Sequence, residues 1–145
     1  MPLDEEPLDS ATNWVAEHTR RYVETDGEDG HFWRGIPTLV LTTMGRRSGR
    51  PRRNALIYGR DGGNYVVVAS KGGADIHPLW YLNLTAEPEV RLQVGADKLR
   101  AHAHTASAEE KARLWPVMAG IFPNYDDYKA KTSRDIPVVV LEPAA

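Results

Sequence analysis

A short arginine-rich segment is the feature of the sequence most able to do chemistry. Residues 46–53 read Arg-Arg-Ser-Gly-Arg-Pro-Arg-Arg and hold five of the 18 lysine and arginine residues of the chain. Guanidinium groups offer forked donors that match the oxygens of phosphates and carboxylates, and Gly45 and Gly49 let the backbone turn sharply around them. The segment predicts a loop that binds an anion, while a solvated basic loop is the plainer interpretation.

Two further segments could complete such a site. Residues 69–73, Ala-Ser-Lys-Gly-Gly, follow an apolar run; the two glycines permit close approach to a ligand, Ser70 can donate a hydrogen bond, and Lys71 adds a cation. Farther along, Trp80 and Asn83 could form a wall of a pocket for a flat ring. A simple turn and a core tryptophan are the alternative interpretations.

Three aromatic residues recur at a spacing of three. Phe122, Tyr125 and Tyr128 would share one face if this segment were helical. Such a face could cover an apolar electron acceptor, and its two phenols could supply a hydrogen bond or a proton. Plain packing is the alternative.

The histidines give a weaker signal. His102 and His104 would point to the same face of a strand, but two imidazoles without a third ligand are weak support for a metal site. We therefore expect no bound metal.

The distribution of charge bears on the kind of ligand. The chain of 145 residues has a net charge of −2, and residues 1–36 carry nine acidic and three basic residues. The arginines therefore form one cationic feature on an otherwise acidic chain, which favours a small anionic ligand over a nucleic acid. An RNA-binding β-barrel that combines these arginines with exposed aromatic residues is the alternative.

The elements that must position these residues are short strands with inserted helices. Strands are predicted over residues 38–43, 54–58, 65–70, 89–94, 98–104 and 136–141. The turns at 61–64 and 95–97 predict hairpins that pair the second strand with the third and the fourth with the fifth. Helices are predicted over 10–26 and 78–86, and a short helical turn over 125–131. A capping box at 107–110 predicts a further helix through Leu114, Trp115 and Met118, in which Pro116 causes a kink or ends the regular part.

This order of elements predicts a mainly β, α+β fold. Strands and helices do not alternate as in a doubly wound sheet, and glycine-rich dinucleotide or P-loop motifs are absent from the sequence. A small barrel of about six mostly antiparallel strands, with helices across its mouths, fits best.

The length and composition predict one domain in an ordinary globular chain. We expect residues 1–9 to form a mobile acidic tail and residues 10–145 a single domain that begins with an amphipathic helix packed on the core. The longest apolar runs have four or five residues, against about 18 for a membrane span. Without an export signal or any cysteine, the protein is expected in the cytoplasm, with at most peripheral contact with the inner face of the membrane.

Taken together in order, these segments resemble the deazaflavin-dependent nitroreductase family of actinobacteria. The resemblance covers residues 36–143 and rests chiefly on residues 41–52 (LTTMGRRSGRPR), 68–74 (VASKGGA), 77–84 (HPLWYLNL), 123–128 (PNYDDY) and 136–143 (IPVVVLEP). It implies a split β-barrel, akin to pyridoxamine-phosphate-oxidase-like proteins, that binds the deazaflavin coenzyme F420. It also implies an F420H2-dependent reductase that transfers a hydride to a planar quinone, enone or nitroaromatic acceptor.

The resemblance further implies a role for individual residues. It assigns the phosphate and glutamate tail of the coenzyme to Arg46, Arg47, Ser48 and Arg52. It places beside the deazaflavin Ala55, Ala69, Ser70, Lys71, Leu79, Trp80 and Asn83. It builds the acceptor wall from Phe122, Tyr125 and Tyr128, with Tyr128 or Tyr125 donating the proton directly or a water ordered by Ser70 donating it instead.

Other functions remain open on the same barrel. FMN could replace F420, although its single phosphate requires fewer cations than the loop offers. A carrier that binds F420 without reducing anything is the non-enzymatic alternative. Exposed barrel edges would also allow a homodimer.

Overall fold

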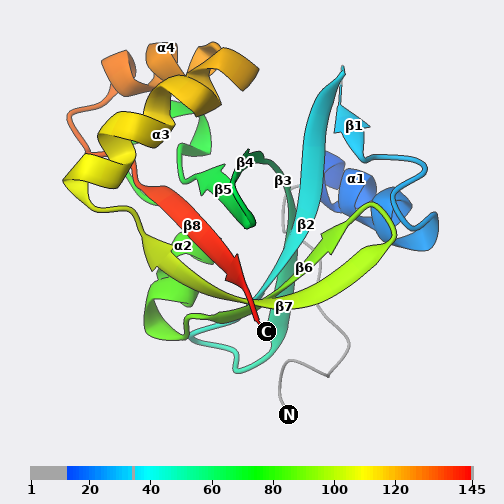
Figure 1. Cartoon of the computed structure of the whole chain (residues 1–145). Helices are drawn as coiled ribbons and strands as arrows, with labels where there is room; N and C mark the ends of the chain where they lie inside the picture. The colour runs from blue at the N-terminus through cyan, green and yellow to red at the C-terminus, as the bar shows by residue number, and fades with distance from the viewer. Residues whose placement is uncertain (1–12, 34, 145) are drawn as a thin grey trace.

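A computed structural model describes residues 13–33 and 35–144, with side chains from residue 17 onward (Figure 1). The tail predicted over residues 1–9 and the first residues of the predicted helix lie outside this part. Along the chain the elements are α1 (Asn13–Glu24), β1 (Phe32–Trp33), β2 (Ile36–Met44), β3 (Pro51–Ile57), β4 (Gly59–Asp61), β5 (Asn64–Val68), η2 (Lys71–Gly73), α2 (Leu79–Ala86), β6 (Glu89–Val94), β7 (Asp97–Thr105), α3 (Ala108–Ile121), α4 (Asn124–Lys131) and β8 (Val138–Pro143).

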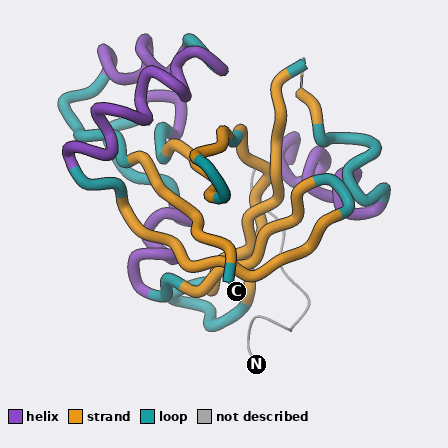
Figure 2. The backbone as a smooth tube through the Cα atoms, viewed as in Figure 1, coloured by secondary structure: helices purple, strands orange, loops and turns teal. Residues whose placement is uncertain are grey.

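The strands form a single curled antiparallel sheet (Figure 2). Its order is β1-β2-β6-β7-β8-β5-β4, and β3 pairs with β2 outside this path. Helices α3 and α4 stack together on one side of the molecule, whereas α1 and β1 lie on the other (Figure 1). The predicted α+β class and antiparallel sheet are confirmed; β1 and β4 were not predicted, because strands of two and three residues are too short to show a period.

The prediction that residues 54–58 pair with residues 65–70 is wrong. Strand β3 pairs along its length with β2, from Thr38 opposite Ile57 to Met44 opposite Pro51. The chain then bends at Tyr58, and the short β4 makes the hairpin with β5 across the predicted turn. At this bend, a Cβ on Gly59 would come within 2.6 Å of the Met118 sulfur of α3, so glycine lets the two elements approach closely without displacing that side chain.

Two strands are buried on both faces, which explains their continuous apolar sequences. In β5 and β8, alternate residues point into the barrel, and the residues between them pack against α3 and α4. The inward set is Tyr65, Val67, Val139 and Leu141, and the outward set is Val66, Val68, Val138 and Val140. The sheet therefore supports a second core under α3 and α4, and this core places α4 beside the end of β5.

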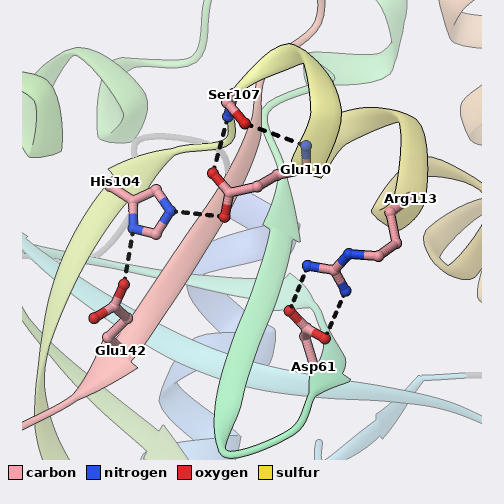
Figure 3. Close-up of polar contacts among 6 residues, drawn as sticks. All are labelled: Asp61, His104, Ser107, Glu110, Arg113 and Glu142. Carbon is pink, nitrogen blue, oxygen red and sulfur yellow. Dashed lines mark hydrogen bonds and ion pairs between the residues drawn. The ribbon is translucent and has the colours of Figure 1, made fainter.

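Helix α3 begins at the predicted capping box and is anchored to three strands (Figure 3). Glu110 accepts the Ser107 backbone N–H at 3.0 Å, and its other oxygen lies 3.1 Å from His104 of β7. The second ring nitrogen of His104 lies 3.1 Å from Glu142 of β8. Arg113 donates two hydrogen bonds to Asp61 of β4. Among the described residues no group of three or more His, Asp or Glu side chains is placed to hold a metal ion.

Pro116 does not end α3, which continues to Ile121. A proline inside a helix removes one backbone hydrogen bond. The helix tolerates this loss because the neighbouring Leu114, Trp115 and Met118 are buried.

Helix α1 covers the outer edge of β3. Among the described strands, β3 pairs with β2 on one side only, so the backbone donors on its other edge need partners from outside the sheet. The Thr19 hydroxyl of α1 accepts one of them, the Ala55 N–H, at 3.2 Å. Tyr22 is fully buried, donates to the Thr38 carbonyl at 2.9 Å and accepts the Gly95 N–H; burial raises the pKa of this phenol to about 12. The predicted packing of the helix on the core is confirmed. Within the described part of the chain, every helix is too short or too polar to cross a bilayer.

Candidate active site

A cavity of about 900 Å³ brings together segments that are far apart in the sequence. Its lining includes the loop between β2 and β3, residues of β3, the turn after β5, the start of α2, and the junction of α3 with α4. All the residues assigned from the sequence line it except Ala69. Ala69 is fully buried in the barrel core, whereas its neighbours Val68 and Ser70 line the cavity.

The loop between β2 and β3 presents cationic side chains to the cavity and uses three of its backbone amides internally. Gly45 N–H donates to the Arg50 carbonyl, Gly49 N–H donates to the Gly45 carbonyl, and Arg50 N–H donates to Ser48 Oγ at 3.2 Å. These amides are therefore used within the loop and cannot cradle an anion as in a P-loop. An anion at this end of the cavity would be held mainly by the side chains of Arg46, Arg47, Arg52 and, from the turn after β5, Lys71.

Asn83 of α2 fixes this loop. Its Oδ1 accepts the Arg46 N–H at 3.0 Å, and its Nδ2 donates to Thr43 Oγ1 at 3.2 Å. The amide side chain is buried and connects α2 to β2 and to the start of the loop. Beside it, Trp80 is 6% exposed and contributes a flat wall, whereas Leu79 is 68% exposed at the cavity rim.

The turn after β5 packs directly on α4. Lys71, Gly72 and Gly73 all have positive φ angles. A Cβ on Gly73 would lie 3.0 Å from the Cα and the carbonyl oxygen of Tyr128, so glycine permits backbone-to-backbone contact there. This contact places Ser70 and Tyr128 on adjoining walls of the cavity.

The opposite end of the cavity is aromatic. Phe122 ends α3 and the two tyrosines lie on α4, yet the three rings cluster, with centroids of Phe122 and Tyr125 5.1 Å apart and those of Tyr125 and Tyr128 6.4 Å apart. Tyr125 is 4% exposed, and burial raises its pKa above the usual range, so it stays protonated. Within the described chain no group hydrogen-bonds the side-chain hydroxyls of Ser70, Tyr125 or Tyr128, so all three remain available to a ligand.

The N-terminal segment supplies two cavity residues that the sequence analysis missed. Trp33 of β1 contacts Phe122 edge-to-face, with ring centroids 6.0 Å apart. His18 of α1 also lines the cavity, and its Nε2–H donates to the Gly30 carbonyl at 2.8 Å. A two-residue strand has no local signature, and His18 showed only the spacing of a buried helix face, so neither could be found without the fold.

Comparisons with known proteins agree with this arrangement. The family model for F420H(2)-dependent quinone reductase matches residues 14–143. An F420H(2)-dependent quinone reductase of Mycobacterium tuberculosis (strain H37Rv) is 41% identical to this chain over 128 residues, which covers 86% of each protein.

Solved structures show the same fold. A structure described as a domain-swapped dimer is 39% identical, has a TM-score of 0.71, and covers 92% of this chain and 100% of its own. The F420-H2 dependent reductase FDR-A is 38% identical with a TM-score of 0.68, covering 73% of this chain and 94% of that one. The split β-barrel is thereby confirmed, and the chain belongs to the F420H(2)-dependent quinone reductase family.

Proposed function

We propose that the protein oxidises reduced coenzyme F420 and transfers a hydride to a quinone within the cavity. The observation that carries this proposal is the polarity of the cavity, which is cationic at the β2–β3 loop and aromatic at the α3–α4 junction. A ligand with an anionic tail and a flat ring would lie with its tail on the arginines and its ring toward the tyrosines. The family and its quinone reductase relatives support the same assignment.

The residues present fit the coenzyme. Arg46, Arg47 and Arg52 would hold its phosphate and glutamate carboxylates, and Lys71 adds a fourth cation from the other wall. The buried face of Trp80 would support the ring system. Four lining cations exceed what a single phosphate requires, which favours F420 over FMN.

The chemistry needed from the protein is orientation and one proton. When bound, the reduced coenzyme supplies a hydride from a ring carbon. Reduction of a quinone to a hydroquinone by a hydride requires one further proton on oxygen. Tyr128, whose hydroxyl has no partner among the described side chains, would donate it, and protonated Tyr125 and Ser70 would hydrogen-bond the acceptor or an ordered water.

A direct assay tests the proposal. Purified protein is mixed under anaerobic conditions with F420H2 or with NADPH, and menadione is then added. Consumption of F420H2 alone is the expected result, read from the return of oxidised F420 absorbance. Binding of F420 without oxidation by any quinone or enone would indicate a carrier, and a yellow protein that retains FMN would indicate the flavin alternative.

The wider acceptor range and the assembly are also proposals. Enones and nitroaromatics are planar acceptors that the aromatic end of the cavity could stack against, and each can replace menadione in the same assay. A homodimer is supported by the relative described as a domain-swapped dimer. Light scattering on the purified chain at several concentrations would detect a dimer or exclude it.

Peripheral contact with the cytoplasmic face of the membrane is a last part of the proposal. Leu79 at the cavity rim is 68% exposed, and Ile76, three residues earlier, is 63% exposed. Exposed apolar side chains at a cavity mouth suit the entry of an apolar quinone from a lipid surface. Co-sedimentation with vesicles, compared between wild type and Leu79→Ser, would test this contact.

A further inference from the structure

Arg134, between α4 and β8, holds the turn that follows β5. Its Nε donates to the Ala74 carbonyl at 2.9 Å, its Nη2 to the Ser70 carbonyl at 2.8 Å, and its Nη1 to the Ala69 carbonyl at 3.1 Å. The same Nη1 lies 2.8 Å from Nδ1 of His77. One guanidinium therefore contacts both ends of the segment 69–77.

These partners are all neutral acceptors. Backbone carbonyls and an imidazole nitrogen surround the half-buried guanidinium, so its contacts are not those of a surface ion pair. Because Arg134 donates to Nδ1 of His77, that nitrogen carries no proton, and burial together with the nearby cation lowers the pKa of His77. The planar fork of arginine reaches several carbonyls at once, whereas the single ammonium of a lysine cannot reproduce this geometry.

Other contacts from the same stretch of chain reach the same turn. Thr132 Oγ1 donates to Asp75 at 2.6 Å, and Lys131 Nζ lies 3.5 Å from the Gly72 carbonyl. Gly73 packs on the backbone of Tyr128. Residues 131–134 thus join the turn that carries Ser70 to the helix that carries Tyr128.

We propose that Arg134 is a positioning residue for hydride transfer. By holding the carbonyls on both sides of the turn, it sets Ser70 and Lys71 relative to Tyr128, and hence the coenzyme ring relative to the acceptor. This inference rests on the proposed function. Among the described residues the hydrogen bonds of Arg134 go to the segment 69–77, and three of the four cations proposed to hold the anionic tail lie outside that segment. Binding of the tail should therefore depend less on Arg134 than placement of the ring does.

The test uses Arg134→Ala with added guanidinium. We expect kcat to fall about tenfold or more, because small misplacement of reacting groups is costly. The coenzyme Kd should change by less than about threefold, because three of the four cations proposed to hold the anionic tail come from the loop between β2 and β3 and only Lys71 comes from the turn. Guanidinium ion at low, non-denaturing concentration should restore part of kcat, whereas ammonium should not, and Arg134→Lys should recover little.

A second readout needs no coenzyme. Amide hydrogen exchange at residues 70–74 should accelerate locally in Arg134→Ala and slow again with guanidinium, while exchange in β6 and β7 stays unchanged. Arg113→Ala is the matched control, because this exposed arginine pairs with Asp61 and neither residue lines the cavity (Figure 3). It should show neither kinetic loss nor rescue.

The outcomes separate the two proposals. Two results with an active wild type would overturn the positioning role alone. In one, Arg134→Ala keeps its kcat; in the other, kcat falls, the coenzyme Kd rises by a similar factor, and guanidinium restores neither. A wild type that does not oxidise F420H2 overturns the proposed function, and the positioning role with it.

Discussion

Replacement of Arg52 with alanine should weaken coenzyme binding more than any other single change in the arginine-rich segment. Arg52 lies on β3 opposite Thr43, lines the cavity, and is half-buried, so it has less side-chain freedom to lose on binding than the exposed arginines of the loop. A charge-assisted hydrogen bond contributes about 1.5–3 kcal/mol, which corresponds to an increase in Kd of about 10- to 150-fold. Arg46 is exposed in the loop, so Arg46→Ala should lie near the lower end of that range.

The assay is a fluorescence titration of F420 with each variant at two salt concentrations. Arg50→Ala is the matched control, since it removes the same charge from the same loop but from a side chain that does not line the cavity. Its Kd should rise by less than about threefold and the difference should vanish at high salt, as expected for screened long-range attraction. Equal losses in Arg52→Ala and Arg50→Ala would refute the reasoning, because the loop would then act only through its net charge.

Three further predictions concern the proton donor, the turn and the start of α3. Tyr128→Phe should lower turnover at least about tenfold with little change in coenzyme Kd. Tyr81→Phe is the control and should keep its turnover, because the Tyr81 hydroxyl pairs with Thr105 and Tyr81 does not line the cavity. Turnover of Tyr128→Phe equal to that of the wild type would rule out Tyr128 as the proton donor. Gly73→Ala should lower the free energy of unfolding by more than about 1 kcal/mol in chemical denaturation. Gly73 has a φ of +82°, and an added Cβ would lie only 3.0 Å from the Tyr128 backbone. The Ser107 backbone N–H holds the pKa of Glu110 below its usual value. The stability that ionised Glu110 contributes is therefore present above its unfolded pKa of about 4.3, and it is lost as the pH falls through the lower pKa of the folded protein. Glu110→Gln should therefore show a weaker acid dependence of stability below that pH, and an identical dependence would contradict the assignment.

Several elements were predictable because their causes lie within a few residues. The capping box that starts α3, the proline before α2 and the turns at 61–64 and 95–97 act through local backbone preferences and hydrogen bonds. All the residues that the resemblance and the residue types assigned to the site line the cavity, except Ala69. The strand alternation turns the methyl of Ala69 into the barrel.

Other features depended on contacts between distant segments. The run 51–57 could have paired with the strand before it or the strand after it; in the structure it pairs with β2, and the separate strand β4, which begins at Gly59, pairs with β5. Pro116 could have ended α3, but the burial of Trp115 and Met118 maintains the helix beyond it.

The sequence by itself determined the chemistry of this protein, since an arginine-rich segment and a trio of aromatic residues keep their chemical character in any fold. Only the tertiary structure decided that Trp33 and His18 line the cavity, that Asn83 fixes the arginine loop, and that Arg134 holds the turn beside Tyr128. Local preferences act over a few residues and can be recognised in the chain. Pairings between distant residues depend on which of many packings buries the most apolar surface with its polar groups satisfied, and that is a property of the whole fold.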